Sequence, residues 1–333
     1  MSSFARNFVL AAAAFAVAIG AVEGILRAAD FSFSFAPSHV EFGWPNPRYL
    51  LKRFERDPDL FWVTKHYSDR LEQFADSSPD IIFLGDSTTE MGLYPEEFVR
   101  RAGLRHPERT IRGENLGVSG WSTYQGAQQF ERDVVSLRPR FVTVNFGWND
   151  HWIGFAVEDK DIHAISRSPL ESIRWLRTGQ LLTKAHYAWR TRGRVLVQHR
   201  VAPGDFADNL GRIIRLARDH RIVPVLLTAP TSHRRGYEPA YLGGRWLSDL
   251  SQVVPLHQRY VDIVRDVARV HGAPLCDLAL DFAALPAQTL RDEYFMSDGI
   301  HLEPRGDAQT AEFLLDCFEG QPELRALWKP RVQ

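Results

Sequence analysis

Residues 81–87 read Ile-Ile-Phe-Leu-Gly-Asp-Ser, and this stretch decides how the rest of the chain is interpreted. Four consecutive apolar side chains are typical of a parallel strand that is buried on both faces. Ligands of an open parallel sheet bind beyond the carboxyl ends of its strands. Asp86 and Ser87 therefore lie where chemistry is expected, and the motif predicts an α/β domain that begins at about residue 78.

Downstream of this motif, short apolar runs alternate with amphipathic stretches, which is the pattern of βα units around a mainly parallel sheet. Further strands are expected to end near Asn115-Leu116-Gly117, to cover 141–146 and 223–228, and to lie around Leu275. Helices are expected at 123–137, from an N-cap at Asp205 to Ala217, from about Leu256 to a stop at Gly272, and at 304–319. The sequence thus predicts five strands that alternate with helices.

Residues 151–204 interrupt this alternation, and we interpret them as an inserted cap or lid. Within them, the segment from Ser168 to Arg194 is predicted to be helical. It has one acidic residue, Glu171, against the basic residues Arg174, Arg177, Lys184, Arg190, Arg192 and Arg194. A solvated helix face and a face directed at an anionic membrane surface or an acidic polymer both stay open.

The start of the chain is an apolar run from Phe8 to Val22, with Arg6 before it and Glu23 after it. Its length suits a signal-peptide core or, when extended to Leu26, a membrane anchor, while a buried soluble helix is a third reading. We expect residues 1–27 to be an anchor or signal peptide. The catalytic domain would then be extracytoplasmic and membrane-anchored, or secreted or periplasmic if the segment is cleaved. Residues 28–77 are expected to be a connector that packs partly on the main domain, residues 78–333.

Composition excludes some partners. The formal net charge is −1, with 40 basic and 41 acidic side chains, so no global field recruits nucleic acid. No histidine and carboxylate cluster has metal-ligand spacing, and no glycine-rich nucleotide loop occurs, so neither metal nor cofactor is expected. The two cysteines, Cys276 and Cys317, are either a disulfide in an exported protein or two buried thiols.

Four polar blocks follow predicted strands or precede the last helix: Gly85-Asp86-Ser87, 117–120, 147–150 and 298–301. A serine hydroxyl becomes a nucleophile when a base takes its proton and a third group orients that base. His301 and Asp298 are predicted to do these two jobs for Ser87. The backbone amides of Ser87 and Gly120 and the side-chain amide of Asn149 are the candidate oxyanion donors.

Each block alone is weak, because turns and caps use the same residues, but their joint order resembles the catalytic blocks of the SGNH/GDSL hydrolase family. The resemblance spans about residues 78–320. It implies a flavodoxin-like three-layer α/β/α sandwich with a five-stranded parallel sheet. It also implies that Ser87, Asp298 and His301 form the catalytic triad and that Gly120 and Asn149 belong to the oxyanion hole. The chain departs from many members at Thr88-Thr89-Glu90 and in the long insertion, which leaves the substrate open.

Three tryptophans crowd the same blocks: Trp121, Trp148 and Trp152. Such rings can bind an acyl chain or a sugar, and local packing is the alternative. His151 and His233 are interpreted as hydrogen-bonded structural histidines, although His151 is adjacent to the Asn149 block and would be a second candidate base.

The predicted function is serine-dependent hydrolysis of a carboxylic ester through an acyl-enzyme on Ser87. The substrate is a lipid, a short acyl ester or an O-acetyl group on a cell-envelope polysaccharide. One alternative is an O-acyltransferase that passes the acyl group to an envelope carbohydrate. A second is a non-catalytic envelope binding module that retains the fold. The expected partners are the ester substrate and, through the first segment, a membrane.

Overall fold

Five parallel strands form the centre of the computed structural model, which describes residues 3–33, 53–77, 79–154, 158–166, 169–190, 192, 198–243 and 247–330. Their order across the sheet is β4-β3-β5-β8-β9. Their bounds are β3 (Ile81–Gly85), β4 (Gly113–Asn115), β5 (Phe141–Asn145), β8 (Val223–Leu227) and β9 (Leu275–Cys276). All four pairings are parallel. The predicted five-stranded parallel sheet is therefore confirmed.

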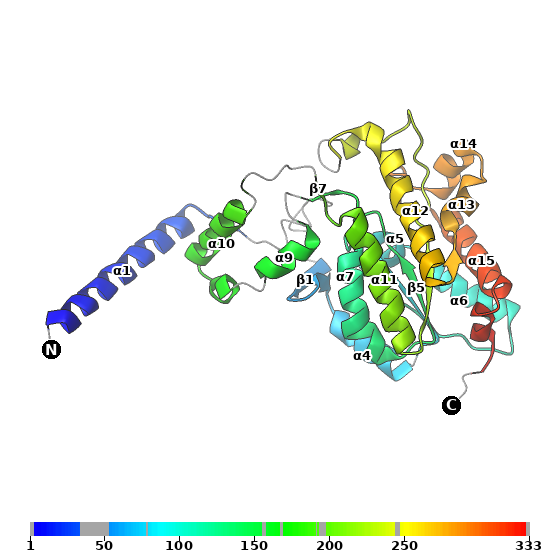
Figure 1. The fold of residues 1–333 in the computed structure, drawn as a ribbon, viewed down its shortest axis with the longest axis horizontal. Coiled ribbons are helices and arrows are strands. Elements are labelled where there is room, and N and C mark those ends of the chain that lie inside the picture. The colour runs from blue at the N-terminus through cyan, green and yellow to red at the C-terminus, as the bar shows by residue number, and fades with distance from the viewer. Residues whose placement is uncertain are drawn as a thin grey trace.

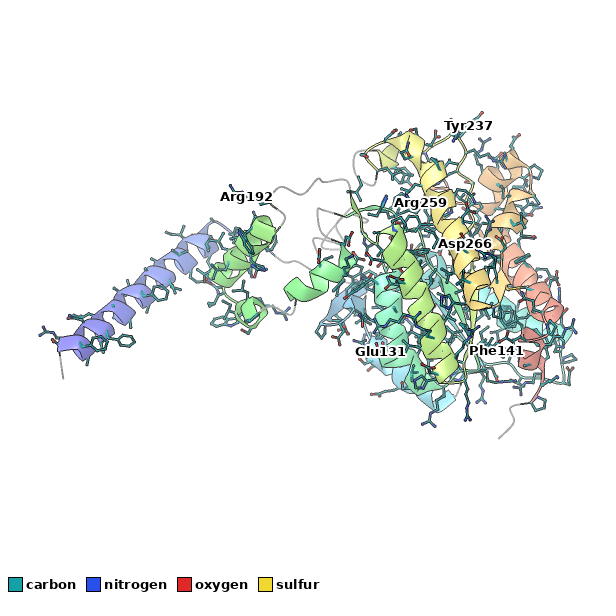
Figure 2. The ribbon with its side chains drawn as sticks, viewed as in Figure 1. Glu131, Phe141, Arg192, Tyr237, Arg259 and Asp266 are labelled. Atoms are coloured by element: carbon teal, nitrogen blue, oxygen red, sulfur yellow. A yellow bond between two sulfur atoms is a disulfide. The ribbon has the colours of Figure 1, made fainter. Side chains whose placement is uncertain are left out.

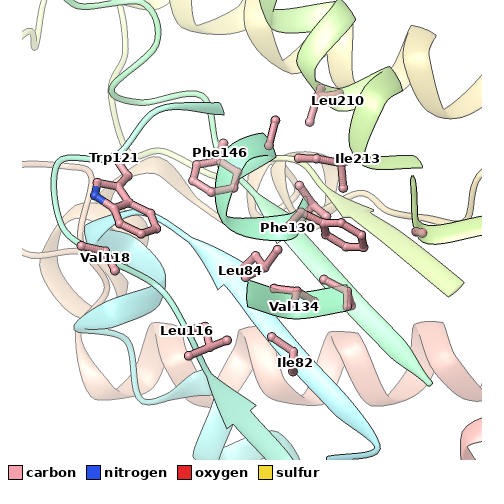
Figure 3. Close-up of a cluster of buried hydrophobic side chains, with 14 of the residues drawn as sticks. Ile82, Leu84, Leu116, Val118, Trp121, Phe130, Val134, Phe146, Leu210 and Ile213 are labelled. Carbon is pink, nitrogen blue, oxygen red and sulfur yellow. The ribbon is translucent and has the colours of Figure 1, made fainter. Parts of the chain in front are cut away.

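Helices cover both faces of this sheet (Figure 1). The alternate side chains of β3 explain why. Ile82 and Leu84 belong to one apolar cluster, while Ile81 and Phe83 belong to the other. Figure 3 shows Ile82 and Leu84 near Phe130 of the first helical layer. That layer contains α7 (Thr123–Gln129), α8 (Val135–Leu137), α11 (Pro203–Asp219) and α12 (Val253–His271). The other layer contains α6 (Tyr94–Arg105), α13 (Leu278–Ala283) and α15 (Pro304–Gly320). The short helix α14 (Ala287–Thr289) follows α13 and has no buried residue. Three layers result, as the fold class requires.

Two of the four helices expected around the sheet differ from their predictions, and α6 and α13 were not predicted. A π-helical segment, Phe130–Val134, joins α7 to α8, so the expected helix at 123–137 is not α-helical throughout. The predicted N-cap at Asp205 is wrong, because Ala202 precedes the helix and Pro203 is its first residue. Proline suits this position, since its fixed φ fits the helix and its missing N–H is not needed there. Gly272 ends α12 in the left-handed conformation, as expected.

The second half of the predicted connector has regular structure and packs on the domain. An antiparallel hairpin of β1 (Phe54–Asp57) and β2 (Phe61–Thr64) is followed by α4 (Tyr67–Ser77). Trp62 is buried, and its indole Nε1 donates to the Ser119 carbonyl at 3.1 Å. The hairpin therefore supports the loop that contains Gly120. Residues 34–52 of the predicted connector lie outside the described residues.

The first helix and part of the insertion lie together, away from the sheet. Helix α1 (Ser3–Ala28) has no buried residue. In the described part of the chain, it is the one helix that is long and apolar enough to cross a membrane. The insertion contains β6 (Ile153–Gly154), α9 (Asp159–Ser166), α10 (Arg177–Arg190) and β7 (Gln198–His199). Figure 1 shows α10 beside α1, and the two helices are in contact. Of the predicted helical segment, residues 168, 191 and 193–194 lie outside the described residues.

A disulfide joins the last strand to the last helix. Cys276 in β9 and Cys317 in α15 are bonded, with their Cα atoms 6.0 Å apart. Of the two readings left open by the sequence, the structure has the disulfide rather than two thiols. Disulfides of this kind persist in oxidising compartments.

Candidate active site

Ser87, His301 and Asp298 form one chain of hydrogen bonds. Ser87 is the first residue of α5 (Ser87–Glu90), directly after β3. His301 Nε2 lies 2.9 Å from Ser87 Oγ, and His301 Nδ1 lies 2.6 Å from Asp298 Oδ2. The other oxygen of Asp298 accepts from the backbone amides of Ile300 and His301, at 2.8 and 2.9 Å. The fold thus brings together residues that are more than two hundred positions apart in the sequence.

The partners of His301 decide which of its ring nitrogens carries the proton. Burial tends to raise the pKa of Asp298, but hydrogen bonds from His301 and from backbone amides outweigh it, so that pKa is lowered. Asp298 is then a carboxylate that only accepts, and Nδ1 of His301 must be its donor. Nε2 of the neutral ring is left to accept from the Ser87 hydroxyl. Burial would lower the pKa of His301, yet the Asp298 carboxylate raises it overall.

A buried carboxyl group, Asp86, connects Ser87 to Asn149. Asp86 Oδ2 accepts from Asn149 Nδ2 at 3.0 Å, and Asp86 Oδ1 accepts from the amide and hydroxyl of Thr88. Asp86 has no exposed surface, and burial raises its pKa although the Thr88 bonds oppose this. A side-chain amide has two N–H donors, so Asn149 keeps one for another acceptor. The contact fixes the Asn149 amide relative to the strand end that carries Ser87.

The turn before Ser87 leaves no room for a larger residue at Gly85. A Cβ there would lie 2.7 Å from the Asn145 carbonyl oxygen and would also clash with Thr89. Asn145 belongs to the neighbouring strand β5. Glycine is therefore required for β3 to turn into α5 against the next strand.

Glu90 ties α5 to the loop of Gly120. Its Oε2 accepts from the backbone amide of Ser119 at 2.6 Å and also from the Ser119 hydroxyl. Its Oε1 pairs with Arg53 Nη2 at 2.6 Å. Gly120 itself has φ +80°, a conformation that favours glycine. Glu90 thus joins α5 to the loop of Gly120, whereas the sequence indicated it only as a departure from the family pattern.

A second charged group holds Gly120 from the other side. Arg200 Nη1 donates to the Gly120 carbonyl at 2.7 Å, and Arg200 Nη2 pairs with Asp159 Oδ2 at 2.8 Å. Both side chains are buried, and Ser122 Oγ also donates to Asp159 at 2.6 Å. The insertion therefore supplies an ion pair that buttresses the Gly120 loop. No signal in the sequence distinguishes Arg200 from a surface arginine.

The three predicted substrate-binding tryptophans occupy packed positions. Trp121 has no exposed surface, and its Nε1 donates to the Trp62 carbonyl at 3.0 Å. Trp148 and Trp152 are also buried, and their rings stack with centroids 5.7 Å apart. Local packing accounts for these contacts, and a role of the rings in substrate binding stays a prediction.

Two histidines near the site have structural partners, in line with their interpretation from the sequence. His233 Nε2 donates to the Asp298 carbonyl at 2.7 Å. His151 is fully buried, lies 3.3 Å from His257 Nδ1 through its Nε2, and has a pKa held well below the ordinary value by burial and by neighbouring imidazoles. His151 is therefore neutral and inaccessible, which disfavours it as a second base.

A surface groove along α12 lies apart from these residues. Across the described ranges, no three His, Cys, Asp or Glu side chains are grouped to hold a metal ion. A groove of about 560 Å³ runs along α12, where Figure 2 labels Arg259 and Asp266. Its lining contains none of the predicted site residues.

Comparison with known proteins identifies the family of this chain. Residues 83–309 match the model of the GDSL-like lipase/acylhydrolase family. The match covers more than half of the chain and spans Ser87 and His301, so the chain belongs to this family. It is thus a hydrolase that acts on ester bonds.

Individual relatives are distant. An uncharacterized lipoprotein of Bacillus subtilis (strain 168), YqeF, is 23% identical over 252 residues, which cover 72% of this chain and 87% of the relative. The acetyl xylan esterase AlAXEase is 18% identical with a TM-score of 0.47, covering 71% of this chain and 98% of that structure. A lipase/acylhydrolase from Enterococcus faecalis is 17% identical with a TM-score of 0.47, covering 77% of this chain and all of that structure.

Proposed function

We propose that this protein is a serine esterase that cleaves a carboxylic ester through an acyl-enzyme on Ser87. The observation that carries the proposal is the continuous hydrogen-bonded chain from Ser87 Oγ through His301 to Asp298, with distances of 2.9 and 2.6 Å. Nucleophile, base and orienting group stand within the reach that acyl transfer requires.

The reaction has two halves. In the first, Ser87 Oγ bonds to the ester carbonyl carbon while its proton moves to His301 Nε2, and the C–O bond to the alcohol then breaks as His301 returns the proton to the leaving oxygen. In the second, His301 takes a proton from water while the water oxygen bonds to the acyl carbon. The bond from that carbon to Ser87 Oγ then breaks as His301 returns the proton to Oγ, and the carboxylic acid leaves. Asp298 stabilises the imidazolium that forms in each half.

The negative charge of the tetrahedral intermediate needs donors that are fixed beforehand. We assign this role to the backbone amides of Ser87 and Gly120 and to the second N–H of Asn149. Asp86 orients Asn149, and Glu90 and Arg200 hold the Gly120 loop, so two of the three proposed donors have a rigid support. Such support is what preorganisation requires, because donors that had to reorient during the reaction would stabilise the transition state less.

We further propose that α1 anchors the catalytic domain to a membrane and that the domain lies outside the cytoplasm. The apolar helix α1 has the length and composition of a membrane span, the Cys276–Cys317 disulfide suits an oxidising compartment, and one relative is a lipoprotein. Protease added to spheroplasts tests this location, because it should digest the catalytic domain, which should otherwise stay with the membrane fraction. A domain that is digested only after the membrane is lysed would refute the proposal.

The substrate is a lipid ester, a short acyl ester or an O-acetyl group of an envelope polysaccharide. The test is turnover of p-nitrophenyl esters from acetate to long acyl chains by the full-length protein in detergent. Ser87→Ala and His301→Ala are the catalytic variants, and His66→Ala, an exposed histidine on the same domain, is the matched control. We expect cleavage by the wild type and the control and none by the two catalytic variants in folded form.

The chain-length profile then separates acetyl from lipid substrates. Cleavage that persists in Ser87→Ala would refute the proposed nucleophile. Absence of cleavage for every ester, together with transfer to an added sugar acceptor, would replace hydrolysis by the acyltransferase alternative.

A further inference from the structure

The N-terminus of α10 is docked onto the last turns of α1 by a single carboxylate. Glu23 accepts from the backbone amides of Arg177 and Thr178, at 3.0 and 2.8 Å, and from the Thr178 hydroxyl at 3.0 Å. These amides are among the four that a helix leaves without an internal partner at its start. Glu23 therefore acts as a helix cap supplied by another helix, and it also pairs with Arg27.

Contacts beyond the cap hold the two helices together. The amide of Phe33, just after α1, donates to Gln180 Oε1 at 3.0 Å. Lys184 Nζ lies 5.6 Å from the centre of the Phe31 ring. The position of α10 is thus fixed relative to the end of α1. That end lies about five residues beyond Glu23, which is about 7.5 Å along the helix axis at the rise of an α-helix.

The outer face of α10 is apolar and exposed. Leu181, Leu182 and Trp189 are 39%, 52% and 68% exposed, and Ala185 and Ala188 between them are exposed as well. At the angular spacing of an α-helix these five side chains fall within an arc of about 120° that contains no charged residue. Gly179 and Thr183, on the opposite face, are buried. Trp175, just before the helix, is 69% exposed. Contiguous apolar surface of this kind marks an interaction site.

Basic side chains border this apolar face. Arg174, Lys184 and Arg192 are exposed, and Figure 2 labels Arg192 beyond the end of α10. An amphipathic helix with tryptophans on its apolar side and lysine or arginine at its borders is typical of helices that lie in the interface of an anionic membrane. Tryptophan rings favour the headgroup level for the same reason.

We propose that α10 lies in the headgroup region of the bilayer that α1 enters, with Leu181, Leu182 and Trp189 reaching into the acyl boundary and the basic residues facing anionic headgroups. The proposal rests on the proposed anchoring of the protein by α1. Glu23 lies at the end of the apolar run, so its contact with Arg177 and Thr178 places the start of α10 at the level where the apolar part of α1 ends. The apolar face of an interfacial helix is buried about 5–10 Å into the boundary between headgroups and acyl chains. The contact of Glu23 with α10 is proposed to lie at this boundary.

Contact of α10 with the membrane would restrict the orientation of the catalytic domain. A single spanning helix would leave the catalytic domain free to rotate about its tether, whereas a second contact with the surface restricts its orientation. Figure 1 shows α1 and α10 together as an arm that extends from the α/β domain. The insertion then contacts the membrane through α10, while Arg200, near its C-terminal end, supports the Gly120 loop.

The test uses full-length protein reconstituted into vesicles of phosphatidylcholine and phosphatidylglycerol. Single variants Leu182→Cys, Val17→Cys and Val270→Cys are labelled with an environment-sensitive fluorophore, and quenching by lipids with a spin label on the acyl chain is measured. Val17 is an exposed residue of α1, and Val270 is an equally apolar, 70% exposed residue of α12 on the catalytic domain. We expect strong quenching at 17, clear quenching at 182 and none at 270.

Quenching at 17 with a signal at 182 as low as that at 270 would overturn the proposal for α10 and leave the anchor intact. Absence of quenching at 17 would overturn the anchor and the proposal for α10 with it. A companion variant, Leu182→Glu with the label at Trp189→Cys, is expected to lose most of the quenching at 189. Unchanged quenching at 189 would show that the apolar face does not hold α10 in the interface.

Discussion

Replacement of Arg200 by methionine tests whether the insertion buttresses the site. Methionine keeps the length of the aliphatic chain but removes every bond to Asp159 and to the Gly120 carbonyl. Asp159 has no exposed surface, so it would remain as a buried carboxylate with Ser122 as its remaining side-chain donor of those described. Removal of one partner from a buried ion pair costs about 3–5 kcal/mol, and we expect the free energy of unfolding to fall by that amount.

Catalysis should respond separately. If Arg200 fixes Gly120, its loss displaces one proposed oxyanion donor, and removal of such a donor costs about 10²–10³ in rate. We expect kcat on the best p-nitrophenyl ester to fall by up to about 10²-fold with little change in KM, since the oxyanion exists only along the reaction path.

The assay combines urea unfolding with steady-state kinetics at a temperature where the variant is folded. Arg269→Met is the matched control, because Arg269 pairs with Asp266 at the surface and the two side chains are 72% and 68% exposed. Exposed pairs contribute little, so the control should change stability by less than about 1 kcal/mol. Equal stability of the two variants would refute the buried ion pair as a stabilising element. A large loss of stability with unchanged kcat would refute its link to Gly120.

Three further outcomes are expected. The double variant Cys276→Ala/Cys317→Ala opens a loop with a sequence separation of 41 residues, and the chain-entropy relation gives a loss of about 4 kcal/mol in urea unfolding, so a loss below about 1 kcal/mol would contradict it. Because the pKa of His301 is raised from its ordinary 6.5 and the base must be neutral, kcat/KM should be full above that raised pKa and fall as pH drops through it; a midpoint below 6.5 would be inconsistent with the Asp298 contact. Asp86→Asn removes a charge that helps to raise the pKa of His301, so the acid limb of kcat/KM should move to lower pH. The kcat should also fall, because Asn149 loses its charged partner. An acid limb that does not move would argue against the electrostatic link between Asp86 and His301.

The same shifts affect stability with opposite signs. The raised pKa of His301 means that its pairing with Asp298 stabilises the fold fully below the ordinary histidine value and less as pH rises through the folded one. The lowered pKa of Asp298 stabilises the fold above the ordinary 3.8 and is lost as pH falls through the folded value.

The meeting of Ser87, Asp298 and His301 was predictable because several blocks, each weak alone, occur in one order in an α/β chain. A continuous apolar run such as 81–84 indicates a buried parallel strand, and the polar residues at its end must lie at the ligand-binding edge of the sheet. Gly85 and Gly120 belong to positions where backbone geometry admits little else. Order along the chain then placed Ser87 and Asn149 after neighbouring strands and His301 shortly before the last helix.

The supports of the site were not predictable, because they are pairings between distant residues. Glu90 and Arg200 are single charged residues in the sequence, and only the fold shows that they meet Ser119 and Gly120. The β1–β2 hairpin was missed because Phe61–Thr64 is buried throughout and shows no alternation of polar and apolar residues. The N-cap of α11 was misplaced because Asp205 is a preferred capping residue, yet the proline at 203 starts the helix earlier.

The central claim, that Ser87 is the nucleophile activated by His301, is tested most directly by covalent labelling with a fluorophosphonate followed by peptide mapping. The expected result is one label per chain, located on the peptide that contains Ser87, lost in Ser87→Ala and greatly slowed in His301→Ala. A label on another residue, or ester cleavage that continues after Ser87 is fully modified, would contradict the mechanism.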